Sequence, residues 1–208
     1  MGRLPRIQLE GHPYHVVMRC NNKEDLFKEE RDFRKLIEII ANFKEKHQFK
    51  LYAYTLMTNH CHLLLEPGDR ASLSVIMRDI MANFAKWYNW RHQRKGHFWE
   101  SRYHASIIED DQYVLVCMRY IHRNPVRAGI VNKAWDYRWT SVRYNVSGER
   151  DELIHDLSSF LGLSPYPRVR IRHYKRWVEE PFDMEKDKGQ FYDPFLGSDL
   201  FREAMQKK

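Results

Sequence analysis

Apolar residues change their spacing repeatedly along the first 125 residues, and the resulting order of strands and helices restricts the possible folds more than any other feature. Runs of β-branched and aromatic residues predict strands, whereas apolar residues three and four positions apart predict helices. The expected order is strand, helix, strand, strand, helix, strand, helix, over residues 13–20, 29–47, 49–57, 61–65, 72–90, 97–108 and 110–122. This order is typical of an α+β fold in which helices pack on one face of an antiparallel sheet.

Beyond the last of these helices the pattern weakens. Pro125 predicts that the helix ends near His122, because proline disturbs the preceding helical turn. We expect a helix over residues 151–162, a linker over 164–167, an extended basic arm over 168–178 and a largely irregular final thirty residues.

Length and composition suit one domain, because the chain has 208 residues of which 43% are hydrophobic. We predict this domain over residues 1–145 and a C-terminal extension over residues 146–208. No apolar run approaches the roughly 20 residues that cross a bilayer, and the N-terminus has no signal-peptide pattern, so we expect a cytoplasmic protein. Three cysteines without paired spacing argue against both a disulfide framework and a four-cysteine zinc site.

Charge is distributed unevenly along the chain. Residues 179–208 contain eight acidic and five basic residues, a net charge of −3. Because the whole chain has a net charge of +7, residues 1–178 have a net charge of +10. An excess of positive charge over this length suggests a polyanionic partner. The charge order also suggests a hypothesis, that the acidic tail from Glu179 onward folds back as a weak mimic of a nucleic-acid backbone.

The segment His60-Cys61-His62 begins an apolar strand. Side chains two apart on a strand point to the same face, so both imidazoles converge while Cys61 points away. Two imidazoles can hold one divalent metal ion. The alternative is a pair of hydrogen-bonded histidines at a sheet edge.

A second candidate group lies near the end of the last helix, where Tyr120 and Asn124 are four residues apart and share a face. That face can present a phenol and an amide oxygen together. Tyr113 lies on the same stripe seven residues earlier, so the alternative is that both tyrosines are core aromatics.

Basic residues near aromatic ones are candidates for gripping phosphates while unpaired bases stack. One group surrounds the helix over residues 72–90 and its exit: Lys86, Arg91, Arg94, Lys95 and Arg102, interleaved with Trp87, Trp90, Phe98 and Trp99. A denser group contains Arg168, Arg170, Arg172, Lys175 and Arg176. Arg3 and Arg6 are suited to an N-terminal arm that contacts a groove. The alternative for each is a solvated basic surface.

Four segments, in the same order, resemble those of the REP-associated tyrosine transposases, which belong to the tyrosine HUH class and are relatives of the single-strand insertion-sequence transposases. They are residues 14–22 (YHVVMRCNN), 57–65 (MTNHCHLLL), 98–103 (FWESRY) and 120–131 (YIHRNPVRAGIV). The similarity extends over about residues 3–145. His122 and Cys20 differ from the residues usual in the family at those positions.

The resemblance implies that His60 and His62 are metal ligands, that Tyr120 is the nucleophile, and that Asn124 is a third ligand where the wider class has glutamine. It also implies a ferredoxin-like βαββαβα core, magnesium or manganese as the metal, and a 5′-phosphotyrosine intermediate. The implied partner is single-stranded DNA with hairpin repeats, bound as monomer or dimer. Three arginines in the matching segments are further expected DNA contacts: Arg19, Arg123 and Arg127.

Two other functions stay open on the residues alone. Ferredoxin-like sheets with basic and aromatic surfaces also bind single-stranded RNA without catalysis, although the strand signatures of that module are missing here. A hydrolytic metal nuclease would use water as the nucleophile, with Tyr120 only packing, and would leave no protein–DNA adduct.

Overall fold

The structure is a computed structural model of the chain, and it describes residues 9–181, 191 and 193–206. The predicted contacts Arg3 and Arg6 lie outside the described residues, as does most of the acidic segment between Pro181 and Asp193. Within the described ranges, no helix is long and apolar enough to cross a membrane.

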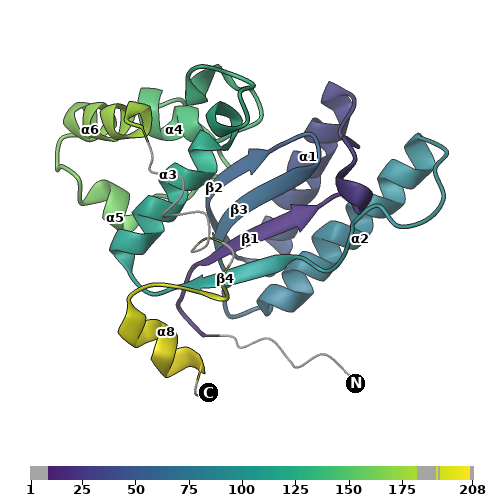
Figure 1. Cartoon of the computed structure of the whole chain (residues 1–208), viewed down its shortest axis with the longest axis horizontal. Coiled ribbons are helices and arrows are strands. Elements are labelled where there is room, and N and C mark those ends of the chain that lie inside the picture. Colours follow the sequence, from purple (N-terminus) through teal and green to yellow (C-terminus); the bar gives the residue numbers. More distant parts are fainter. Residues whose placement is uncertain (1–8, 182–190, 192, 207–208) are drawn as a thin grey trace.

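A five-stranded sheet forms the centre of the molecule (Figure 1). Its order is β2-β3-β1-β4-β5, and every neighbouring pair is antiparallel except β4 and β5. The strands are β1 (Tyr14–Arg19), β2 (Lys50–Leu56), β3 (His60–Glu66), β4 (His104–Ile108) and β5 (Phe195–Leu196). The expected βαββαβα order is therefore confirmed, with β4 shorter than the extended segment predicted over residues 97–108.

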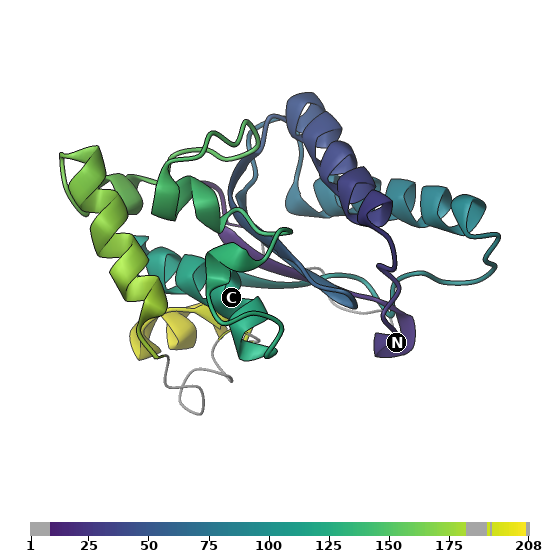
Figure 2. The same ribbon diagram turned by 90° about the horizontal axis from the view of Figure 1, so that it is seen from above.

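Helices cover both faces of the sheet, which corrects the expectation of helices on one face (Figure 2). One face carries α1 (Glu30–His47) and α2 (Leu73–Arg91), and the other carries α3 (Asp111–Arg127). The physical reason lies in the strands, which are apolar on both sides. Leu63 packs in the core with α1 and α2, while its neighbour Leu64 packs in the core under α3.

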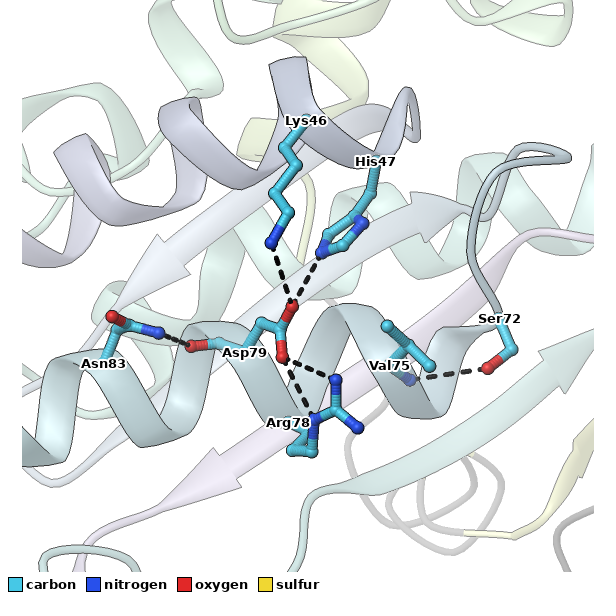
Figure 3. A network of polar contacts seen from close by, with 7 residues as sticks. All are labelled: Lys46, His47, Ser72, Val75, Arg78, Asp79 and Asn83. Carbon is cyan, nitrogen blue, oxygen red and sulfur yellow. Dashed lines mark hydrogen bonds and ion pairs between the residues drawn. The ribbon is translucent and has the colours of Figure 1, made fainter.

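Polar contacts join the end of α1 to the start of α2 (Figure 3). His47 Nε2 lies 2.9 Å from an Asp79 carboxylate oxygen, and Arg78 donates to the other oxygen at 2.9 Å. Burial would raise the pKa of Asp79, but hydrogen bonds from Arg78 and His47 and the nearby charge of Lys46 lower it overall. This contact holds the two helices together on the face opposite α3.

Helix α3 runs to Arg127 and so continues past Pro125, contrary to the predicted end near His122. Proline removes only its own amide, whose usual acceptor would be the carbonyl four residues earlier. Nearby, the Asn124 side-chain amide donates to the Tyr120 carbonyl at 2.9 Å, and the Ala128 amide donates to the Asn124 carbonyl at 3.0 Å. These bonds stabilise the final turn, so Asn124 is fully helical.

The C-terminal extension is more regular than predicted. Only Ser158–Leu161 (α5) is helical within the segment predicted over residues 151–162, while Val142–Ser147 (α4) forms before it. The basic segment is not an extended arm but a helix, α6 (Pro167–Glu179), because Pro167 starts it and the buried Tyr174 and Val178 lie one turn apart. The remaining elements are the short 3₁₀ helices η1 (Asn21–Lys23) and η2 (Ala134–Asp136), and α8 (Asp199–Gln206).

Candidate active site

His60 and His62 lie on the face of β3 that is covered by α3. Their ring centroids are 4.9 Å apart at an interplanar angle of 81°. Cys61 points to the opposite face and is buried in the core with α1 and α2. The predicted convergence of the two imidazoles is therefore confirmed, and β3 lies inside the sheet rather than at its edge.

Each of the two imidazoles has its Nδ1 atom engaged. His60 Nδ1 lies 2.6 Å from Asn59 Oδ1, and His62 Nδ1 lies 2.9 Å from His15 Nε2 on β1. Because an amide oxygen only accepts, His60 Nδ1 carries the proton and its Nε2 has a lone pair. His62 Nε2 is buried and has no hydrogen-bond partner among the described residues. This pattern fits a pair of metal-binding histidines oriented by other side chains.

Both histidines are held neutral. Burial lowers the pKa of His60 to about 4, and the charges of Arg19 and Arg127 act in the same direction. Burial also lowers the pKa of His62 well below its usual value, with smaller effects from its histidine and arginine neighbours. A neutral imidazole is the form that ligates metals.

Tyr120 projects from α3 onto His62. Its ring lies 5.7 Å from the His62 ring, edge to face, and only 2% of the residue is exposed. Phe191, from the C-terminal segment, stacks on the same ring at 3.9 Å and 18°. This contact from the acidic tail is apolar, and the hypothesis that the tail mimics a nucleic-acid backbone stays a prediction. Tyr113 is only partly buried and packs against the same core.

Asn124 follows Tyr120 by one helical turn and is 7% exposed. Its amide nitrogen is used in the bond to the Tyr120 carbonyl, which leaves the side-chain oxygen as a possible metal ligand. Among the described residues, no group of three or more His, Cys, Asp or Glu side chains can hold a metal ion. Among the described residues, a third protein ligand beside the two histidines would be of another type, such as a carboxamide oxygen.

Arg127 brings positive charge to the tyrosine. Its guanidinium carbon lies 4.5 Å from the centre of the Tyr120 ring, and its Nε and Nη1 atoms are buried without a hydrogen-bond partner in the part of the chain that the structure describes. Arg19 on β1 lies opposite His60 on β3 in the strand register and is partly exposed. Both are suited to binding a phosphate beside the histidines.

Several predicted DNA contacts have other partners or lie apart from Tyr120. Trp99 is a core residue, since it is 9% exposed and its indole donates to the Met81 carbonyl at 2.9 Å, so it offers no open stacking surface. Lys86, on α2, and Lys95 and Arg102, in the segment after it, are exposed on the opposite side of the sheet. Nearby, Arg91 pairs with Glu29 at 3.3 Å, and Arg94 donates to the His97 carbonyl at 2.7 Å.

The arginines of α6 have two different orientations. Arg168 and Arg172 are exposed one turn apart, whereas Arg170 donates to the Ser164 carbonyl at 3.0 Å. Arg123, on α3, donates to the Val178 carbonyl of α6. Arg170 and Arg123 therefore help to hold the extension in place, and Arg168 and Arg172 remain the candidates for phosphate contact.

Comparisons to known proteins agree with this fold. A family model described as "Transposase IS200 like" matches residues 8–124, more than half of the chain. The chain therefore belongs to the IS200-like transposase family.

Two individual relatives are both REP-associated tyrosine transposases. The Haemophilus influenzae protein named "Putative REP-associated tyrosine transposase" is 24% identical over 115 residues, which are 50% of this chain and 65% of that protein. The matched region thus spans less than two thirds of that relative. The solved structure of a REP-associated tyrosine transposase bound to a REP hairpin is 20% identical, has a TM-score of 0.60, and covers 76% of this chain and 96% of its own. At this identity the likeness shows the fold.

Proposed function

We propose that this chain is a metal-dependent endonuclease and strand transferase that acts on single-stranded DNA at hairpin-forming repeats. The observation that carries the proposal is the position of the Tyr120 ring, 5.7 Å from the ring of His62 and beneath the guanidinium of Arg127. A tyrosine that only packed in the core would not need the rings of His15 and His62 and a cation around it. Family membership supports the same reading.

In the proposed reaction, the Tyr120 phenol oxygen attacks a backbone phosphorus. The bond from phosphorus to the 3′ oxygen breaks, which leaves a 5′-phosphotyrosine and a free 3′-hydroxyl. The phenol loses its proton, and the leaving oxygen gains one. The energy of the phosphodiester stays in the phosphotyrosine bond, so attack by a 3′-hydroxyl can reseal or transfer the strand without ATP.

The side chains have separate tasks in this reaction. His60, His62 and Asn124 would hold a divalent metal, with Mn²⁺ favoured by the imidazoles and Mg²⁺ compatible with the carboxamide. When bound, the metal supplies Lewis-acid stabilisation of charge on the phosphate. Arg127 would donate hydrogen bonds to the phosphate from its unpartnered nitrogens.

DNA binding is assigned to the exposed cations. Arg168 and Arg172 on α6, and Lys86, Lys95 and Arg102 on α2 and in the segment after it, are exposed and would contact the backbone of a folded strand. The related protein whose structure is solved was bound to a REP hairpin. We extend that class of substrate to this chain.

The decisive test compares wild type with Tyr120→Phe, which removes one oxygen and keeps the ring. Wild-type protein with Mn²⁺ or Mg²⁺ and a panel of hairpin-bearing single strands should give a DNA–protein adduct that survives denaturing electrophoresis. Tyr120→Phe should bind the same strands and neither cut nor crosslink them. Tyr113→Phe is the matched control, because it makes the same change on the same helix and should behave as wild type.

Other outcomes would assign other functions. Cleavage by Tyr120→Phe at the wild-type rate would indicate a hydrolytic nuclease. Binding of single strands with no cleavage by wild type under any metal condition would indicate a non-catalytic binding module. An adduct mapped by mass spectrometry to a different tyrosine would remove Tyr120 from the reaction.

A further inference from the structure

We propose that His15 is a positioning residue that fixes the tautomer of His62 and thereby leaves His62 Nε2 as the ligand atom. The inference rests on the proposed function, in which His62 holds the metal, and adds a role for a residue on a different strand. The C-terminal segment takes part, because the carbonyl of Phe191 fixes the tautomer of His15.

The three groups form a continuous hydrogen-bonded row. His15 and His62 are both fully buried on adjacent strands, and their rings are nearly parallel, with an interplanar angle of 9°. His15 Nε2 lies 2.9 Å from His62 Nδ1. On the other side of the same ring, His15 Nδ1 lies 3.3 Å from the carbonyl oxygen of Phe191.

The direction of hydrogen-bond donation along this row follows from the Phe191 carbonyl at its end. A carbonyl oxygen only accepts, so His15 Nδ1 must carry the proton and donate it. In a neutral imidazole the other nitrogen is then an acceptor, so His15 Nε2 must receive the proton of His62 Nδ1. Burial of both rings away from water favours these neutral forms. The lone pair of His62 is therefore on Nε2, the buried nitrogen without a hydrogen-bond partner among the described residues.

The opposite direction is disfavoured at both ends. It would place the lone pair of His15 Nδ1 against the lone pairs of the Phe191 carbonyl, two acceptors in a buried site. It would also put the proton of His62 on Nε2, where it would block ligation. Ser106 Oγ lies 3.4 Å from the same Phe191 carbonyl oxygen, but its single proton is donated to the nearer Asp193 carbonyl, so the proton on the Phe191 side of the row comes from His15.

His60 has a simpler arrangement that serves the same purpose, since its Nδ1 is held by the neighbouring Asn59 oxygen. The two candidate ligands thus have separate supports. One support is local in sequence, and the other depends on β1 and on a residue 176 positions after His15. Loss of His15 should therefore affect His62 and spare His60.

The test uses the full chain and two substitutions at one position. His15→Phe keeps a ring of similar size and removes both nitrogens. His15→Gln provides an amide oxygen that can accept from His62 Nδ1. His47→Gln is the control, because it alters another buried histidine, at the far face between α1 and α2. Folding of each variant is checked by circular dichroism.

Two readouts are measured, and neither is catalytic activity. In titration calorimetry, His15→Phe should bind Mn²⁺ about 10–100-fold more weakly than wild type, the range for loss of a group that orients a ligand. His15→Gln should recover most of that loss, and His47→Gln should match wild type. In nitrogen-15 NMR of the metal-free wild type, His62 should be the tautomer with its proton on Nδ1.

Each adverse result has a distinct meaning. A proton on Nε2 of His62 in the wild type, or unchanged Mn²⁺ affinity in a folded His15→Phe, would overturn the role of His15. The wild-type NMR measurement needs no variant, so the proposal stays testable if His15→Phe fails to fold. Failure of the proposed function is recognised separately, because His60→Ala would then bind Mn²⁺ as tightly as wild type.

Discussion

Acid should unfold this protein well above the pH at which carboxylates titrate, because several buried histidines are neutral in the folded state. Burial lowers the pKa of His15 and His122 to about 3, and burial together with Arg19 and Arg127 lowers that of His60 to about 4. In the unfolded chain the same groups titrate near 6.5. Their contribution to stability is therefore complete above pH 6.5 and declines as the pH falls toward the folded-state values.

The size of the effect follows from the number of protons. Each group that binds a proton only when unfolded lowers the free energy of unfolding by up to about 1.4 kcal/mol per pH unit. Three such groups give at most roughly 4 kcal/mol per unit, or about 5 kcal/mol between pH 6.5 and 5, because each is only half protonated in the unfolded chain at pH 6.5. Total stability of a domain is typically about 5–15 kcal/mol. The metal-free protein should thus lose a large part of its stability by pH 5.

Urea unfolding at several pH values between 7 and 5, in the presence of a chelator, measures this slope. His122→Gln is the matched variant, because His122 lies outside the candidate metal site and bonds to the Tyr174 hydroxyl at 2.9 Å and the Ser141 hydroxyl at 3.1 Å. Glutamine can keep such bonds without titrating. The slope of the free energy of unfolding against pH should therefore fall by the equivalent of about one proton taken up on unfolding. If unfolding of the wild type takes up less than one proton across this pH range, the reasoning is refuted.

Three further predictions concern function. His60→Ala or His62→Ala should abolish cleavage and leave hairpin binding within a few-fold, measured by gel shift, and cleavage surviving in both would exclude the metal site. Replacing Arg168 and Arg172 together should reduce the slope of log affinity against log salt by about 1.4, at roughly 0.7 per single-strand phosphate contact, and an unchanged slope would mean that this face is not bound. Phe191→Ala should raise the rate of adduct formation by uncovering the phenol, and a rate equal to wild type would show that the segment leaves before the reaction.

Much of the core fold was predictable because it depends on local periodicity. The pairing of His60 with His62 follows from the two-residue repeat of a strand, and the four-residue spacing of Tyr120 and Asn124 follows from a helix. Pro125 misled the prediction of the helix end, since the penalty of proline was weighed without the hydrogen bonds of the last turn. The α+β class was unaffected by that error.

The remaining features depend on contacts between distant parts of the chain. The arginines at 168, 170 and 172 alternate like an extended arm, whereas the burial of Tyr174 and Val178 against the core selects a helix. His15 looks like an isolated histidine in an apolar strand, and only the register of β1 against β3 brings it to His62. No local pattern connects Phe191 with a tyrosine 71 positions earlier.

The stacking of Phe191 on Tyr120 also has a consequence for synthesis of the chain. Phe191 is synthesised roughly 70 residues after Tyr120, which at roughly 5–20 residues per second is about 4–14 s later. During that interval a growing chain can bring Tyr120 to His60 and His62 while Phe191 does not yet exist. Each newly made molecule would therefore pass once through an uncovered form before the ring of Phe191 stacks on the tyrosine.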